Sequence, residues 1–94
     1  MKVALKLYLP MLADVIGRSE LEVTFDGRTA ADLLRHLVAT HGKRAAGALF
    51  DTSGRLDLEV QLLRNRKEWI TRENIETELD DGDQITIMVL MGGG

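Results

Sequence analysis

Cysteine is absent from the 94-residue sequence, proline occurs once, and aromatic side chains make up only 4% of it. Without cysteine the chain has no thiol nucleophile, no thiolate metal ligand and no disulfide, and this composition fits a reducing cytoplasm. No apolar run approaches the roughly 18 residues that a membrane-spanning helix requires. With 45% hydrophobic and 29% charged residues, the sequence indicates a single cytoplasmic domain that folds by core packing alone.

Basic residues are also in the minority. Twelve lysines and arginines stand against 15 aspartates and glutamates, which gives a net charge of −3. This balance opposes binding to nucleic acid. In the first 13 residues a lysine precedes apolar residues, but Lys6 interrupts the run and no clear small-residue cleavage site follows. We therefore interpret this segment as a strand, and we expect neither nucleic acid nor a membrane as a partner.

Apolar and polar side chains alternate in two early segments, a pattern typical of strands with one buried face. The apolar positions are Val3, Leu5, Leu7 and Leu9 in the first, and Leu21, Val23 and Phe25 in the second. Pro10 ends the first segment because it has no backbone N–H to donate to a sheet. The two segments are expected to form a hairpin around a loop that contains Gly17.

One helix is predicted from about Ala30 to His41. Thr29 and Asp32 have the spacing of an N-terminal capping pair, and Gly42 suits the residue that ends a helix. The apolar stripe of this helix consists of Leu33, Leu34, Leu37 and Val38. We expect this stripe to be buried against Leu5, Leu7, Val23, Val60 and Ile87.

Three further strands are predicted in the second half, near residues 58–62, 68–70 and 85–89, with a turn at residues 80–83. Residues 43–50 have no clear assignment beyond a short turn at Leu49 and Phe50. Residues 74–79 have room for one or two turns of helix. The order predicts the α+β class, in which a mixed sheet of four to five strands packs on one main helix.

The residues of a conventional active site are missing. No Ser-His-Asp arrangement, phosphate-cradling glycine loop or metal-ligand spacing is present. Chemistry is instead expected at the C-terminus, where Met91 is followed by Gly92, Gly93 and Gly94. Glycine lets a backbone pass through a constriction, and residues 90–94 can extend roughly 17 Å at about 3.3–3.6 Å per residue. We expect residues 1–91 to form the domain and residues 92–94 a flexible tail.

These features together resemble the MoaD/ThiS group of ubiquitin-like proteins, which includes the small subunit of molybdopterin synthase and the thiamine-pathway sulfur carrier. The resemblance covers the strand-strand-helix opening, the helix capped by Thr29, the stretch from Leu79 to Ile85, and the glycine terminus. It implies the β-grasp fold. The family usually ends in two glycines, whereas this chain has three, so the working terminus is either Gly94 or a trimmed Gly93.

The resemblance also implies a function. A ubiquitin-activating-type enzyme would adenylate the carboxylate of Gly94, and a sulfur donor would convert it to a thiocarboxylate. A sulfur-accepting synthase subunit would then use that sulfur in cofactor biosynthesis, with molybdopterin or tungstopterin ahead of thiamine or cysteine. ATP and magnesium would belong to the partner enzyme. This chain would bind no cofactor or metal and would be a carrier rather than an enzyme.

Met88, Leu90, Met91, Gly92 and Gly93 are the candidate partner-binding residues. If Ile85, Ile87 and Val89 face the helix, Met88 and Leu90 should face outward beside the tail.

Two alternatives remain open at this point: a protein modifier that is conjugated to lysines through Gly94, and an interaction module with an inert tail. His36 and the acidic series from Glu73 to Asp83 are interpreted as solvated. Trp69 is interpreted as a packing residue, and Arg64 as a partner contact or part of a polar turn.

Overall fold

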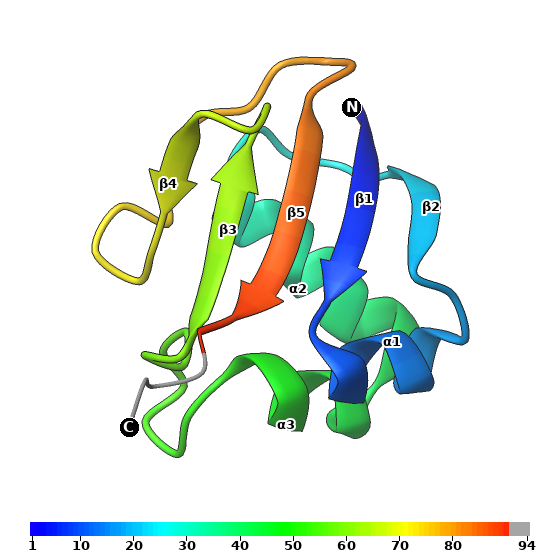
Figure 1. Cartoon of the computed structure of the whole chain (residues 1–94), viewed down its shortest axis with the longest axis vertical. Helices are drawn as coiled ribbons and strands as arrows, with labels where there is room; N and C mark the ends of the chain where they lie inside the picture. The colour runs from blue at the N-terminus through cyan, green and yellow to red at the C-terminus, as the bar shows by residue number, and fades with distance from the viewer. Residues whose placement is uncertain (91–94) are drawn as a thin grey trace.

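The computed structural model describes residues 1–90, which form one mixed five-stranded sheet and three helices (Figure 1). The elements in chain order are β1 (Lys2–Tyr8), α1 (Pro10–Ile16), β2 (Glu20–Thr24), α2 (Ala30–His41), α3 (Lys43–Leu49), β3 (Val60–Arg64), β4 (Glu68–Ile70) and β5 (Gln84–Val89). The strand order is β2-β1-β5-β3-β4. The predicted α+β class and β-grasp architecture are confirmed.

The sheet is mixed because its first and last strands are parallel neighbours. β5 pairs with β1 in parallel, with Leu5 opposite Ile85, and with β3 in antiparallel fashion, with Leu62 opposite Ile87. β2 and β4 pair antiparallel with β1 and β3. The strand that leads to the C-terminus is therefore the central strand of the sheet.

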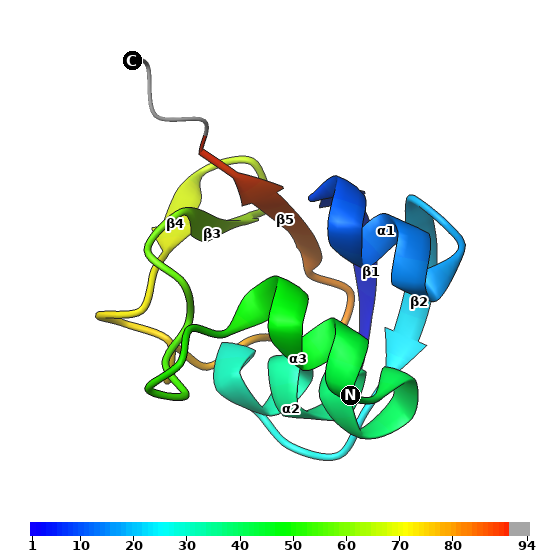
Figure 2. The same ribbon diagram turned by 90° about the horizontal axis from the view of Figure 1, so that it is seen from below.

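α2 covers one face of the sheet and leaves the other open, while α1 and α3 lie at the end of the sheet where β1 and β5 finish (Figure 2). The predicted core is confirmed, since Leu33, Leu34 and Leu37 of α2 are at most 1% exposed. They belong to one buried cluster with Leu5, Leu7, Val23, Val60 and Ile87. Val38, which was expected in this core, is only half-buried and packs at its margin.

The predicted capping of α2 is also confirmed. The Thr29 hydroxyl accepts a hydrogen bond from the backbone N–H of Asp32 at 3.1 Å, and the Asp32 carboxylate accepts one from the N–H of Thr29 at 3.2 Å. These hydrogen bonds satisfy N–H groups that have no partner inside the helix. The backbone hydrogen bonds from Arg28 and Thr29 hold the pKa of Asp32 below its usual value.

The predicted loop between the first two strands is wrong, because α1 lies there. Pro10 is the first residue of this helix, where the N–H that proline lacks would have no partner anyway. Leu12 is fully buried, and Gly17 ends the helix at φ 85°, a left-handed conformation that glycine adopts without strain. The proline that ends the strand thus also begins a helix.

The segments around the main helix differ from expectation in two further places. Residues 43–49 form α3, which buries Ala45, Ala48 and Leu49. Residues 74–79 form turns rather than helix, because their carbonyls accept from the first turn of α2: Ala30 donates to Thr77 at 3.0 Å and Ala31 to Ile75 at 2.9 Å. This segment serves as a backbone partner for α2.

Candidate functional site

The end of β5 is the place from which the chain leaves the sheet. Ile85 and Ile87 anchor this strand in the core with no exposed surface. The last described residue, Leu90, is held through its backbone N–H, which donates to the carbonyl of Glu59 at 2.7 Å. The predicted site residues Met91, Gly92, Gly93 and Gly94 lie outside the described residues. Leu90, the residue that precedes them, is placed at the end of β5.

The two other predicted partner-binding residues have different exposures. Leu90 is 44% exposed, whereas Met88 is half-buried on the open face of the sheet between Tyr8 of β1 and Gln61 of β3. Both positions agree with the expected outward orientation. Their role in partner binding stays a prediction.

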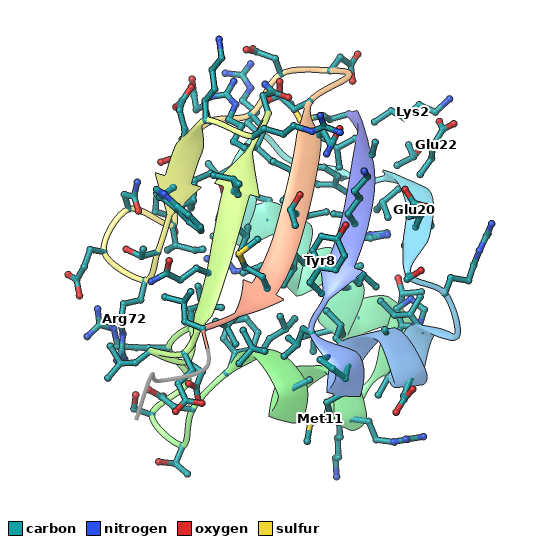
Figure 3. All side chains as sticks on the ribbon, in the orientation of Figure 1. Lys2, Tyr8, Met11, Glu20, Glu22 and Arg72 are labelled. Atoms are coloured by element: carbon teal, nitrogen blue, oxygen red, sulfur yellow. The ribbon has the colours of Figure 1, made fainter. Side chains whose placement is uncertain are left out.

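Sequence reasoning missed two further apolar residues at this end of the sheet. Tyr8, which pairs with Met88, is 60% exposed (Figure 3), and Leu58, next to the Glu59 that holds Leu90, is 71% exposed. The exposure of Tyr8 could have been predicted, because Tyr8 is at an outward position in the alternation of inward and outward side chains along β1. Leu58 fell within the strand predicted near residues 58–62, but β3 begins only at Val60. We refer to Tyr8, Leu58, Met88 and Leu90 as the exit surface.

The open face continues this apolar character toward β4. Trp69, interpreted from the sequence as a packing residue, is 49% exposed and lies opposite Leu63, which in turn lies opposite Thr86 of β5. Leu63, Trp69 and Met88 lie on the open face over β3, β4 and β5, beside the polar side chains of Gln61 and Thr86. Exposed apolar surface beside a chain terminus is typical of a protein interface.

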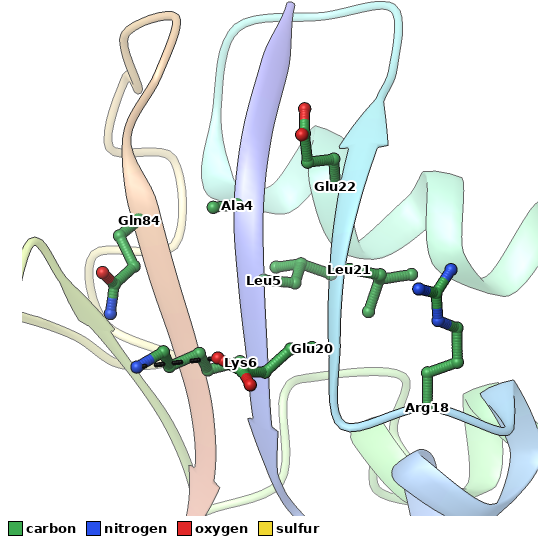
Figure 4. Close-up of a pocket in the computed structure, with 8 residues that line it drawn as sticks. All are labelled: Ala4, Leu5, Lys6, Arg18, Glu20, Leu21, Glu22 and Gln84. Atoms are coloured by element: carbon green, nitrogen blue, oxygen red, sulfur yellow. Dashed lines mark ion pairs between the residues drawn. The ribbon is translucent and has the colours of Figure 1, made fainter.

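The other half of the open face is charged. Lys2 and Lys6 of β1 form ion pairs with Glu22 and Glu20 of β2 at 3.0 and 3.7 Å. Between them the small side chain of Ala4 leaves a shallow hollow (Figure 4). Exposed pairs of this kind contribute little to stability. The open face therefore carries exposed apolar side chains among polar ones over β3, β4 and β5, and ion pairs over β1 and β2.

A buried charge network fixes the start of β5. Asp83 is 7% exposed and accepts from Arg64 Nε at 2.7 Å, from Asn65 Nδ2 at 2.9 Å and from the backbone N–H of Asp80 at 2.8 Å. Burial raises the pKa of Asp83, but these hydrogen bonds outweigh it and hold the pKa below its usual value.

This network corrects two interpretations made from the sequence. Arg64 was expected to keep a turn wet or to touch a partner, yet its side chain is only 14% exposed. Asp83 was grouped with solvated acids, yet it is buried. Asn65 and Arg66 have positive φ values of 51° and 62° in the turn after β3. The network joins this turn to β5 and so determines where the last strand begins.

Conventional binding chemistry is not evident in the described part of the chain. Within residues 1–90, no three His, Asp or Glu side chains are grouped as metal ligands. His36, expected to be solvated, is half-buried, and its ring lies 6.3 Å from that of Phe25. No helix among these residues has the length and apolar character needed to cross a bilayer.

Known proteins with similar sequences or structures point to one family. Residues 7–94 match the model of the ThiS family. The chain is 32% identical over 69 residues to small archaeal modifier protein 3 of Haloferax volcanii, which covers 73% of each chain.

Two solved structures share the fold over nearly all of their length. SAMP1 from Haloferax volcanii superimposes with a TM-score of 0.79 and 26% identity over all of both chains. Small archaeal modifier protein 1 from Methanosarcina acetivorans has a TM-score of 0.76 and 27% identity, and the match covers 99% of this chain and 96% of that one. The chain belongs to the ThiS family of ubiquitin-like proteins, whose members are small carriers or modifiers rather than enzymes.

Proposed function

We propose that this protein is a ubiquitin-like sulfur carrier whose reactive group is the carboxylate of Gly94. The observation that supports this most directly is the path of β5, which runs through the centre of the sheet and ends at the exit surface, next to the glycine terminus. The central strand β5 fixes the place at which the chain leaves the sheet. The glycines that follow have no side chains, which suits entry into a partner's active site. Family membership supports the same function.

The proposed chemistry has two steps. A free carboxylate is a poor electrophile, so a ubiquitin-activating-type enzyme with ATP and magnesium first joins the Gly94 carboxylate to AMP and releases pyrophosphate. A donor at the sulfide level, written as HS⁻, then attacks the acyl carbon, the C–O bond to the phosphate breaks, and AMP leaves with the electrons of that bond. The product is a thiocarboxylate that a synthase subunit uses in molybdopterin or tungstopterin synthesis. The need for an ATP-dependent partner supports a cytoplasmic location for the proposed reaction.

The exit surface is the proposed docking site for the adenylating enzyme. Tyr8, Leu58 and Leu90 are each at least 44% exposed. A few side chains that are fully buried on association carry most of the binding energy of protein interfaces, and tyrosine is among the enriched types. These three residues lie near the end of β5. An enzyme bound to them would therefore have Leu90, where the tail begins, against its own surface.

A second candidate function is protein modification. It is favoured by the relatives described above, which are named as small archaeal modifier proteins. The activated carboxylate would be the same, but a lysine amine of a target would displace AMP and form an isopeptide bond. The two functions therefore share the adenylate and differ in the nucleophile that attacks it.

One experiment distinguishes the two functions. The chain is incubated with its adenylating enzyme, ATP and a sulfur donor and followed by intact-protein mass spectrometry, and lysate is probed on reducing gels. A carrier shows the sulfur-for-oxygen mass increase and no conjugates, whereas a modifier shows a ladder of covalent conjugates. A terminus that neither gains sulfur nor forms conjugates would contradict both functions and leave an interaction module with an inert tail.

A further inference from the structure

The outer edge of β2 is an unpaired sheet edge. β2 lies at one end of the strand order and, among residues 1–90, pairs only with β1. The other terminal strand, β4, has three residues, and the carbonyl of Trp69 in it accepts from the side-chain amide of Asn74 at 3.2 Å. A short edge with a side-chain partner is one of the usual protections against strand addition. β2 is longer, with five residues.

The register shows which backbone groups of β2 face outward. Phe25 and Met1 exchange both backbone hydrogen bonds, at 2.9 and 3.0 Å, and Leu7 donates to Ser19 at 2.8 Å. In an antiparallel pair such hydrogen-bonded positions recur at every second residue. The backbone N–H and C=O groups of Leu21 and Val23 therefore also point toward β1. The N–H and C=O groups of Glu20, Glu22 and Thr24 therefore point away from the sheet. Within residues 1–90 none of these groups has a hydrogen-bond partner.

The side chains along this edge have different character on the two faces. Glu20 and Glu22 project on the open face, and their side chains are 71% and 67% exposed although each also contacts a lysine of β1. A carboxylate can accept from both sides, so each glutamate can bind a second cation from a neighbouring strand. On the other face Leu21 is half-buried, and Arg18 extends beside it on the outer side of β2 (Figure 4).

These side chains oppose pairing between two copies of the chain. Two antiparallel β2 edges at full overlap would place Glu22 opposite Glu22, and like charges directly opposite each other destabilise a sheet. A strand with lysine or arginine at the same positions would instead extend each Lys–Glu pair into a Lys–Glu–Lys row. Repulsion of the wrong partner and attraction of the right one are both means of specificity.

We propose that the outer edge of β2 binds an extended segment of a partner protein in which basic and apolar residues alternate. The segment would add a sixth strand, with its basic side chains beside Glu20 and Glu22 and an apolar side chain beside Leu21. Backbone hydrogen bonds would supply affinity and the alternating side chains specificity. β1 separates β2 from β5, so the added strand would lie away from the end of β5.

The proposal is tested by NMR on the full-length ¹⁵N-labelled chain without any enzyme, so the result is independent of the function of Gly94. The probe is a capped peptide of sequence TKVKLKT, and the matched control is TEVELET. We expect TKVKLKT to shift the amide signals of Glu20, Glu22 and Thr24 and to slow their hydrogen exchange, and we expect high salt to weaken this binding. TEVELET should leave these signals unchanged.

Two variants separate the contributions of charge and backbone. Glu22→Lys should weaken TKVKLKT binding about three- to tenfold, since it replaces one exposed ion pair by a repulsion. Thr24→Pro removes one outward N–H without changing the charge and should also weaken binding, whereas Thr24→Ser should not. Melting temperatures check that each variant is folded.

Four outcomes would overturn the proposal: equal binding of both peptides, shifts that map to the exit surface, no shift with either peptide, and exchange protection that rises with protein concentration alone. The last would identify a second copy of the chain as the occupant.

Discussion

Arg64 in β3 donates from Nε to Asp83 Oδ2 at 2.7 Å, across 19 residues of sequence, and both side chains are largely buried. Without the Asp83 carboxylate, the buried Arg64 side chain would lose its 2.7 Å hydrogen bond and keep the one to the exposed Asp80 at 2.9 Å. We therefore expect Asp83→Asn to lower the free energy of unfolding by about 1–3 kcal/mol at pH 7, as measured by urea denaturation. Asp26→Asn, at an exposed position, is the control and should change it little.

The same network predicts a pH dependence. The pKa of Asp83 is lower in the folded state than its usual value of about 3.9. A carboxyl of this kind stabilises the fold above the unfolded-state pKa, and the contribution is lost as the pH falls through the folded-state pKa. The difference in unfolding free energy between the original chain and Asp83→Asn should thus be full at pH 7 and shrink below about pH 4. A difference that is constant down to pH 3 would show that the charge of Asp83 is not responsible.

The exit surface makes a prediction that separates docking from stability. Leu90→Asp places a charge on an exposed apolar residue, so it should slow adenylation at low enzyme concentration about tenfold or more. The free energy of unfolding should change by less than about 0.5 kcal/mol. Pyrophosphate exchange and urea denaturation measure the two effects. Ala39→Asp, on an exposed position of α2, is the control. If Leu90→Asp unfolds the chain, Leu90 belongs to the core and the docking role is wrong.

The third glycine gives a prediction about the terminus. We expect Gly94 itself to be activated without trimming, because one extra glycine lengthens the tail by roughly 3.5 Å and adds no side chain. After incubation with the adenylating enzyme, ATP and a sulfur donor, the mass increase should appear on the full-length chain. Its appearance only on a chain that lacks Gly94 would identify Gly93 as the working terminus.

The cap of the main helix can be tested separately. Thr29→Ala removes the hydroxyl that accepts from Asp32 and should cost about 1 kcal/mol of unfolding free energy. Thr29→Ser keeps the hydroxyl and should cost less than half as much. Equal losses in the two variants would mean that the methyl group of Thr29, rather than its hydrogen bond, is the stabilising part.

Periodicity predicted the elements that bury a regular apolar face. α2 was predicted with its observed bounds, and the stripe of Leu33, Leu34 and Leu37 is buried as expected. The short helices α1 and α3 were missed because seven residues hold too few turns for a helical period to be distinguished. In α1 the single proline also favoured the end of a strand over the start of a helix.

The candidate site was only partly predictable for a related reason. Leu90 could be assigned to the surface because its neighbours alternate regularly. The outward orientation of Tyr8 also followed from the alternation along β1. Its place in the exit surface, however, depends on Met88, which becomes its neighbour through the β1–β5 pairing. Likewise, the burial of Asp83 depends on Arg64, 19 residues away. Such contacts are determined by tertiary structure and leave no local sequence pattern.

The parallel pairing of β1 with β5 has a consequence for protein synthesis. In a growing chain whose residues 84–89 are still inside the ribosome, β1 and β2 can pair with each other, and so can β3 and β4. The two pairs are not joined, because β5 lies between them in the sheet. Pairing between segments that are far apart in the sequence is slow, because the loop between them must be closed first. The pairing of Tyr8 with Met88 therefore arises only after β5 has left the ribosome, so an unfinished chain lacks the complete exit surface for an activating enzyme to bind.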